Sequence, residues 1–182
     1  LRAGPLEKAP ASMEAFFSLF AANKRKLGSP TMPALFFEEV LRCFGEKAFL
    51  FGVWHETRIV GAVISFLHGD TVIPYYAGVD PESEYMQVSN VMYVELMRYA
   101  VERGLRRFDF SRSRRDSGAA RFKEHQGFEP EQLHYEYFLV KRKEMPNLSP
   151  TNPRFGKAIE LWRKLPLKFT QLIGPPVAKY LG

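Results

Sequence analysis

The segment FDFSRSRRDSGAARFKEHQGF, residues 108–128, combines charged and hydroxyl side chains in a pattern suited to binding an anionic substrate. Phe108 and Phe110 alternate with polar residues, which predicts a short strand with one buried face. The turn after this strand is crowded with basic and hydroxyl side chains, at Ser111, Arg112, Ser113, Arg114 and Arg115. Guanidinium groups beside a helix N-terminus attract phosphate or carboxylate. The alternative interpretation is an exposed arginine turn that caps an ordinary helix.

The residues after this turn predict that helix. Ser117 is a good N-cap, and the helix is expected to run to Gln126 and to stop at Gly127 in the C′ position. Strand, basic turn and helix in this order form the candidate site.

Several segments resemble the C-terminal half of Fem-type transferases, proteins built from two GNAT-like domains. They are KRKLGSP at 24–30, PYYAG at 74–78, NVMYVELMRYAVERGLRRFDF at 90–110, ARFKEHQGF at 120–128 and GFEPEQLHYEY at 127–137. The most similar group is the FemAB-like proteins associated with exosortase and PEP-CTERM systems. The resemblance covers nearly the whole chain, and it implies a GNAT-like fold and transfer of an acyl or aminoacyl group. Two positions depart from the family pattern, because Ser111 stands where a Gly is usual and Gln126 where a Trp is usual.

Transfer to an amine needs a positioned nucleophile, removal of its proton and stabilisation of an oxyanion on the donor carbonyl. The resemblance implies that Phe122 and Lys123 match the Phe-Lys pair of Fem transferases, so Lys123 is our candidate for oxyanion stabilisation. Asp109 is the second catalytic candidate, as proton acceptor or as partner of an arginine. The candidate substrate-binding residues are Ser111, Arg112, Ser113, Phe122, Tyr75, Tyr76, Asn90 and His134. Each of four candidates also has an alternative interpretation. Lys123 would be a surface lysine, Asp109 an ion-paired aspartate, one of the two tyrosines a core residue and His134 a structural histidine.

The pattern of turns and apolar residues predicts an α+β domain over residues 1–143, with a mostly antiparallel mixed sheet flanked by helices. We expect helices at 11–22, 32–44 and 91–103, with Thr31 capping the second and Ser89 or Asn90 the third. We expect strands at 48–55, 58–67, 71–79 and 132–140, besides the one that begins at Phe108.

Residues 144–182 are predicted to form a basic tail broken by prolines. From Lys141 to Gly182 nine Lys or Arg stand against two Glu, so this stretch carries the excess behind the formal net charge of +6. Apolar residues such as Trp162, Phe169 and Leu172 are interleaved with the basic ones, which suits either a weak peripheral membrane contact through residues 154–182 or an arm packed on the body. Pro166, Pro175 and Pro176 are expected to prevent one continuous helix.

Other features limit the chemistry. Four His and one Cys show no metal-ligand spacing, so we expect no metal, and Cys43 is interpreted as a buried hydrophobic residue. GVDPESEYMQVSN follows the 71–79 strand in place of a glycine-rich phosphate turn, so we expect no coenzyme A cofactor.

Leu1 in place of Met suggests a piece of a longer protein, and no leader or membrane-spanning run is evident. We expect a cytoplasmic protein, with a peripheral position at the inner face of the membrane as an option.

These observations favour one hypothesis for function and leave two alternatives open. The first is transfer of an acyl or aminoacyl group to an amino group of a cell-envelope or exopolysaccharide acceptor. By resemblance, the partners would be an upstream GNAT-like half, a donor such as aminoacyl-tRNA, and an envelope or polysaccharide precursor. The alternatives are a non-catalytic binding half and a CoA-dependent N-acetyltransferase.

Overall fold

The computed structural model describes residues 1–140, 143, 145 and 155–179. The chain divides into two compact units. Unit 1 comprises Leu1–Ser111 with Ala158–Gly182, and unit 2 comprises Arg112–Lys157. The predicted domain boundary at residue 143 falls next to residues outside the described part and stays a prediction.

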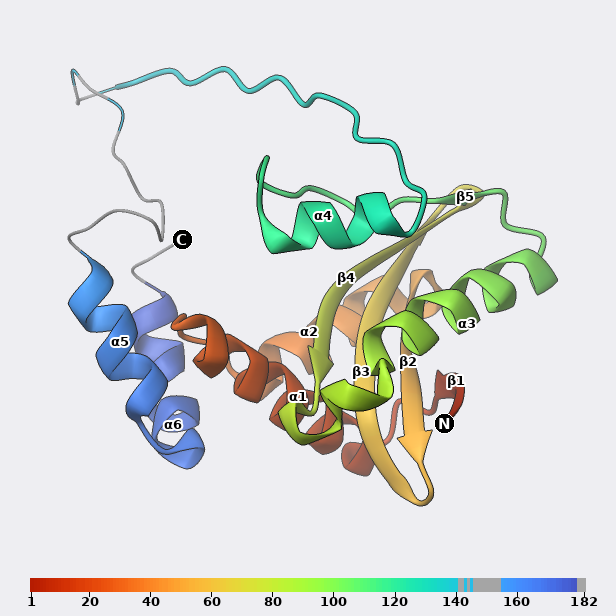
Figure 1. Ribbon diagram of the computed structural model, residues 1–182, viewed down its shortest axis with the longest axis horizontal. Helices are drawn as coiled ribbons and strands as arrows, with labels where there is room; N and C mark the ends of the chain where they lie inside the picture. Colours follow the sequence, from red (N-terminus) through yellow and green to blue (C-terminus); the bar gives the residue numbers. More distant parts are fainter. Residues whose placement is uncertain (141–142, 144, 146–154, 180–182) are drawn as a thin grey trace. The chain divides into compact units, whose positions relative to one another are not determined.

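Unit 1 is built on a five-stranded sheet with the order β1-β2-β3-β4-β5 (Figure 1). The strands are β1 (Arg2–Leu6), β2 (Ala48–His55), β3 (Arg58–His68), β4 (Thr71–Val79) and β5 (Arg107–Phe108). β1 to β4 run antiparallel to their neighbours, and β5 pairs parallel to β4. The predicted mixed, mostly antiparallel sheet is therefore confirmed, and β1 is a strand that the sequence analysis missed.

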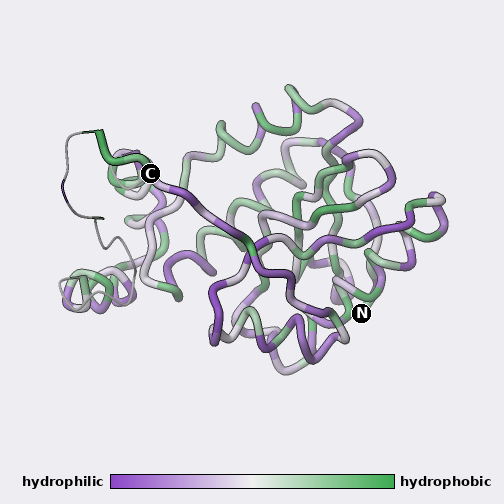
Figure 2. Tube along the Cα trace, turned by 90° about the horizontal axis from the view of Figure 1, so that it is seen from above, coloured by the Kyte–Doolittle hydropathy of each residue, from purple (hydrophilic) through white to green (hydrophobic). Residues whose placement is uncertain are grey.

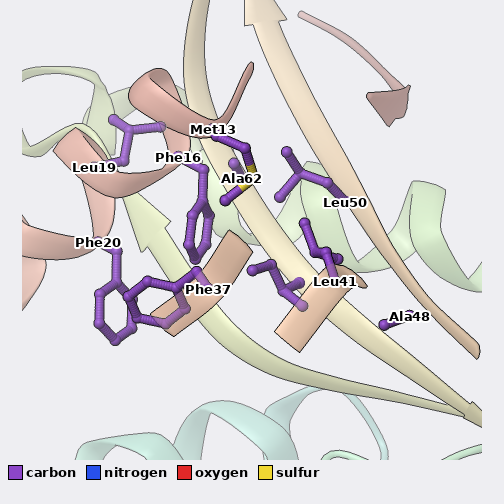
Figure 3. Packing of buried hydrophobic residues seen from close by; sticks show 10 residues of the cluster. Met13, Phe16, Leu19, Phe20, Phe37, Leu41, Ala48, Leu50 and Ala62 are labelled. Carbon is purple, nitrogen blue, oxygen red and sulfur yellow. The ribbon is translucent and has the colours of Figure 1, made fainter. Parts of the chain in front are cut away.

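Helices cover both faces of this sheet, because side chains along each strand alternate between the faces. Ala62 and Ile64 of β3 pack in a cluster with α1 (Pro10–Leu27) and α2 (Ala34–Phe44), whose centre is formed by Phe16 and Phe37 (Figure 3). Val63, between them in the sequence, packs instead in the cluster under α3 (Val88–Glu102). The sheet is thus buried on both faces, as its nearly continuous apolar strands require.

The first two helices were placed correctly, but three details differ from expectation. α1 continues through Lys24–Lys26 and ends at Gly28, which has φ 77° and donates its N–H to the Arg25 carbonyl. Pro33 rather than Thr31 precedes α2, because the buried Thr31 hydroxyl donates to the Met32 carbonyl instead of capping. Cys43 is exposed, since α2 turns Phe37 and Leu41 to the core and the cysteine away from it.

The chain from β4 onward follows the predicted order with two corrections. A short 3₁₀ helix, η2 (Pro81–Met86), leads into α3, and the residue before α3 is Gln87 in a left-handed conformation, so neither Ser89 nor Asn90 caps the helix. In unit 2, α4 (Gly118–His125) forms as expected, with the Ser117 hydroxyl accepting from the Ala120 N–H at 3.1 Å. The strand predicted over residues 132–140 is wrong: this stretch pairs with no strand in the described structure.

Helices α5 (Gly156–Lys164) and α6 (Leu167–Ala178) form the described part of the tail. Pro166 separates them as predicted, but α6 runs through Pro175 and Pro176, contrary to the expected break. Both helices lie beside the C-terminal end of α1 (Figure 1). The Arg25 guanidinium donates to the Leu165 carbonyl at 3.2 Å, which ties the connection between the two helices to α1.

A close backbone approach joins α1 to the sheet at Gly78. A Cβ on Gly78 would lie 2.5 Å from the backbone of Leu19 and Phe20, whereas a Cβ on Gly4 of β1 would make only a 4.0 Å contact with the Trp54 side chain. We expect Gly78→Ala to lower the free energy of unfolding by roughly 1–3 kcal/mol or more, because α1 must be pushed off β4. Urea unfolding followed by circular dichroism measures this. Gly4→Ala is the matched control, and equal stability of the two variants would contradict the close approach.

Candidate functional site

The outer edge of β4, the edge that faces β5, is paired over only two positions. The parallel ladder contains Thr71 with Arg107 and Val72 with Phe108, and it ends where the Asp109 N–H donates to the Val72 carbonyl at 3.0 Å. Backbone groups alternate between the two edges of a strand, so the next outward position is Pro74. Proline has no N–H, and pairing cannot continue through it. Beyond Val72, this edge of β4 has no strand partner in the described part of the chain.

A bulge in β4 brings Tyr75 and Tyr76 together on the side of α1 and α2. The register against β3 shifts between Ile64 and Ser65, leaving Tyr75 as the extra residue, and the two tyrosine rings lie 4.8 Å apart. Tyr76 packs on Phe37 and Phe20 in the core, and burial raises the pKa of its phenol. Tyr75 is exposed. The packing of Tyr76 agrees with the alternative of a core tyrosine, and a role of Tyr75 in substrate binding stays a prediction.

The turn after β5 is held by Asp109. Its carboxylate oxygen accepts the Ser111 N–H at 2.7 Å, and Ser111 adopts a left-handed conformation with φ 58°. Glycine adopts such a conformation without steric cost, whereas a side chain with a Cβ disfavours it. The hydrogen bond from Ser111 to Asp109 therefore stabilises a conformation that a serine otherwise disfavours. Asp109 has at least this positioning role.

Phe110 continues the alternation predicted for this segment. Its ring is buried and lies 4.9 Å from the ring of Phe108 and 4.8 Å from the ring of Tyr93 on α3. Burial raises the pKa of Tyr93 to about 12, so its phenol stays protonated at physiological pH. The Tyr93 ring thus packs on the residue two positions after β5, a contact that the sequence analysis did not predict.

Unit 2 carries Arg112, Lys123 and most of the basic turn. The Lys123 ammonium donates to the Arg112 carbonyl at 3.5 Å, and the Arg115 guanidinium donates to the Gln132 side chain at 2.7 Å. Gly127, with φ 84°, ends α4 as predicted, and the following Phe128 N–H donates to the Lys123 carbonyl. α4 thus holds Lys123 close to the turn that contains Arg112.

The remaining candidates are dispersed. Unit 1 contains half of the candidates, namely Asp109, Ser111, Tyr75, Tyr76 and Asn90. Unit 2 contains the other half, namely Arg112, Ser113, Phe122, Lys123 and His134. Ser113 and His134 are exposed, and Phe122 and Lys123 are half-buried. The Asn90 side chain donates to the Gln87 side chain at 2.7 Å, at the first turn of α3. The structure brings together Asp109 with Ser111, Tyr75 with Tyr76, and Lys123 with Arg112.

Acidic residues in the connection from β4 to α3 form the ion pairs and hydrogen bonds that stabilise it. Asp80 is buried; its carboxylate pairs with Arg58 at 3.0 Å and accepts from the Glu82 N–H and the Ser83 hydroxyl. The Ser83 N–H donates to the Asp80 carbonyl, and Glu84 pairs with Lys26 of α1 at 2.6 Å. Backbone N–H groups of this turn are therefore used internally.

Residues missed by the sequence analysis also lie along β4. The Asn23 side chain on α1 donates to the Ala77 carbonyl at 3.3 Å. One helical position further, the Lys24 ammonium lies 5.4 Å from the centre of the Phe20 ring, and burial lowers the pKa of this lysine. Ser65, opposite Pro74, has a buried hydroxyl without a hydrogen-bond partner in the described structure. KRKLGSP was noted in the sequence, but its tertiary contacts could not be predicted from local pattern.

Within the described residues, no group of three or more His, Cys, Asp or Glu side chains is arranged to hold a metal ion. The same part of the chain contains no helix that is long and apolar enough to cross a membrane.

A family model described as an acetyltransferase (GNAT) domain matches residues 2–124. The match spans more than half of the sequence, so the chain belongs to the GNAT acetyltransferase domain family. No curated protein matches the chain. The assignment to the FemAB-like group is finer than this match and remains a proposal.

Solved structures of acetyltransferases share this fold. An aminoglycoside acetyltransferase from an uncultured soil metagenomic sample, in complex with sisomicin, has a TM-score of 0.60 at 16% identity, over 76% of this chain and 96% of that one. The ribosomal-protein-S18-alanine N-acetyltransferase of Escherichia coli has a TM-score of 0.56 at 17% identity, over 77% and 84%. The ribosomal-protein-alanine N-acetyltransferase of Brucella melitensis biovar Abortus 2308 has a TM-score of 0.59 at 16% identity, over 76% and 99%. At these identities the likeness shows the fold.

The left-handed conformation of Ser111 leads to a stability prediction. We expect Ser111→Gly to raise the free energy of unfolding by up to about 1 kcal/mol, because glycine removes the steric cost of positive φ, and Ser111→Val to lower it by at least as much. Chemical denaturation measures both changes. Ser113→Gly, in the same turn but without positive φ, is the control and is expected to lose a little stability. A Ser111→Gly variant less stable than Ser113→Gly would contradict the role of backbone conformation.

Proposed function

We propose that the chain transfers an acyl or aminoacyl group to an amino group of a cell-envelope or exopolysaccharide-related acceptor, as one half of a two-domain Fem-like enzyme. Membership of the GNAT domain family supports N-acyl transfer. The finer proposal rests on the turn between β4 and α3. In this turn Asp80 accepts the Glu82 N–H and pairs with Arg58, and Glu84 pairs with Lys26.

This turn is poorly suited to a pyrophosphate. A phosphate needs free N–H groups and positive charge, but Pro81 has no N–H and the N–H groups of Glu82 and Ser83 are already bonded within the turn. Two cations lie at this turn, and both are paired: Lys26 with Glu84 and Arg58 with Asp80. A donor that lacks the coenzyme's pyrophosphate, such as an aminoacyl ester, avoids this conflict.

The outer edge of β4 also offers little to the amide-containing arm of coenzyme A. An extended amide chain would bind a free strand edge through backbone hydrogen bonds. At the outward positions of β4, Pro74 lacks a donor and the Ala77 carbonyl already accepts from Asn23. Both features weaken the recognition of such a chain.

The proposed roles follow from the chemistry of each side chain. Lys123 stabilises the oxyanion on the donor carbonyl, with Arg112 binding a phosphate or carboxylate of the substrate. Asp109 holds the turn that carries the basic residues and is the second catalytic candidate. Phe122 and Tyr75 offer aromatic surfaces to the substrate. The proposed set of substrate-binding residues also includes Tyr76, Ser111, Ser113, Asn90 and His134.

The proposed partners are an upstream GNAT-like half of the same protein, an acyl or aminoacyl donor that includes aminoacyl-tRNA, and an envelope or polysaccharide precursor. The proposed location is cytoplasmic, with a peripheral position at the inner face of the membrane. The family match also favours a second candidate function, CoA-dependent N-acetylation, because the family and the similar solved structures are acetyltransferases.

Calorimetry separates the two candidates. We expect titration of coenzyme A and of acetyl-CoA into the chain to give no binding at micromolar concentrations, because Asp80 and Glu84 oppose the pyrophosphate. Micromolar binding of coenzyme A that acetyl-CoA displaces would overturn this proposal and favour the acetyltransferase.

Substitution of Lys123 tests the proposed catalytic role. In the protein with its upstream half, we expect Lys123→Ala to reduce transfer from labelled aminoacyl-tRNA to an acceptor amine by about 10²- to 10³-fold, as loss of one oxyanion-stabilising group does. Arg121→Ala is the matched control, because Arg121 is an exposed cation on the same helix and donates to the Asp116 carbonyl. Near-normal turnover of Lys123→Ala, with the two variants equally folded by circular dichroism, would remove Lys123 from the mechanism.

A further inference from the structure

Helices α5 and α6 pack on the body through one side only. A Cβ on Gly28 would collide with the Ile159 side chain of α5, and a Cβ on Gly174 of α6 would lie 3.2 Å from the Thr31 backbone N. Thr170 and Gly174, four residues apart on α6, are both buried. This side of the tail therefore packs on α1 and on the loop after it, as the arm interpretation expected, whereas the burial of all its apolar side chains that this interpretation also expected is not found.

The opposite side of α6 exposes a row of apolar residues. Phe169, Leu172 and Pro176 follow each other at spacings of three and four, so they lie on one face of the helix. Leu172 is 74% exposed and Phe169 is 47% exposed, although both are large hydrophobic residues. On α5, Leu161 is 63% exposed. Packing on α1 thus leaves these side chains uncovered in the described structure.

Basic side chains border this row. Lys168 and Lys179 fall on the same helical face as Leu172, four residues before it and seven after it, and both are exposed. We call Lys168, Phe169, Leu172, Pro176 and Lys179 the α6 face. Figure 2 shows hydrophilic and hydrophobic residues mixed along these helices. Arg163 and Lys164 of α5 add positive charge, so residues 158–179 contain four basic residues against Glu160, a formal net charge of +3.

We propose that the α6 face binds the surface of an anionic lipid bilayer. Apolar side chains flanked by lysines suit the interface, because the rings and methyl groups enter the acyl boundary while the ammonium groups extend to the lipid phosphates. A nucleic acid would not need the exposed leucine and phenylalanine side chains. The net positive charge selects anionic over neutral lipid.

The prolines of α6 keep this contact shallow. Pro175 and Pro176 have no N–H to donate to the carbonyls of Gln171 and Leu172, so these two carbonyls lose their helical donors. Unpaired carbonyls are not tolerated in hydrocarbon but are hydrated at the headgroup level. Binding is therefore interfacial, weak and dependent on salt.

Co-sedimentation with vesicles tests the proposal directly. The whole chain is mixed with sucrose-loaded vesicles of phosphatidylcholine alone or with about one third phosphatidylglycerol, in about 0.05 M and about 0.5 M NaCl. We expect binding to the anionic vesicles at low salt and its loss at high salt or without the anionic lipid. Leu172→Glu and the triple variant R163E/K164E/K168E are each expected to lower the partition coefficient by roughly tenfold or more.

Matched variants elsewhere on the chain give the controls. Val101→Glu changes an apolar residue of α3 that is 73% exposed, and K47E/R103E/R106E makes the same change in net charge at exposed positions away from the tail. Both should bind anionic vesicles better than the tail variants do. Circular dichroism melting verifies that all variants fold.

Three results would overturn the proposal. They are absence of binding to anionic vesicles at low salt, unchanged binding by both tail variants, and equal losses in the tail and control variants. Conversion of a dimer to a monomer by Leu172→Glu, without any vesicle binding, would assign the α6 face to a second copy of this chain. Vesicle binding requires no donor or acceptor, so its outcome is independent of the proposed transfer activity.

Discussion

The approach of α1 to β4 at Gly78 is the contact on which the rest of unit 1 depends. A side chain at this position would collide with the α1 backbone. From this fixed position, α1 reaches three regions: Asn23 donates to the outer edge of β4, Lys26 pairs with the turn before α3, and Arg25 holds the tail. One glycine therefore sets the geometry of the strand edge, the turn and the arm together.

The turn after β5 shows how a serine is accommodated in a left-handed conformation. Ser111 has positive φ, and the carboxylate of Asp109, two residues earlier, accepts its N–H. This geometry gives Asp109 a structural reason to be present whether or not it also takes part in proton transfer. The carboxylate that looked catalytic in the sequence is thus first of all a support for the turn that presents the arginines.

Elements defined by local signals could be predicted from the sequence. Gly28, Gly104 and Gly127 all have positive φ and end their helices, and Ser117 caps α4, because each signal acts within a few residues. β1 was missed because a five-residue edge strand has no pattern of its own and exists through its pairing with β2. Residues 132–140 alternate apolar and polar side chains as a strand does. This pattern alone does not provide a neighbouring strand for backbone pairing.

The candidate site was predictable to a lesser degree, for the same physical reason. Lys123 and Arg112 are near in sequence and lie near each other in unit 2, and the accessible Tyr75 follows from a bulge beside a proline. Asn23 and Tyr93 were not predicted, since their roles arise from helices packing on distant strands. Cys43 was misplaced because its apolar neighbours suggested burial, while the helical period turns it outward.

The chemistry of the β4–α3 turn connects these observations to function. A GNAT fold has a strand edge and a helix start at this place, and either could serve a phosphorylated acyl carrier. Here Asp80 is buried, is neutralised by Arg58 and is bonded to the groups that would bind a phosphate. A buried carboxylate with these bonds is expensive to displace, because breaking the pair leaves an uncompensated charge. The turn is therefore stabilised by its own side chains, and the N–H groups of Glu82 and Ser83 are bonded within it.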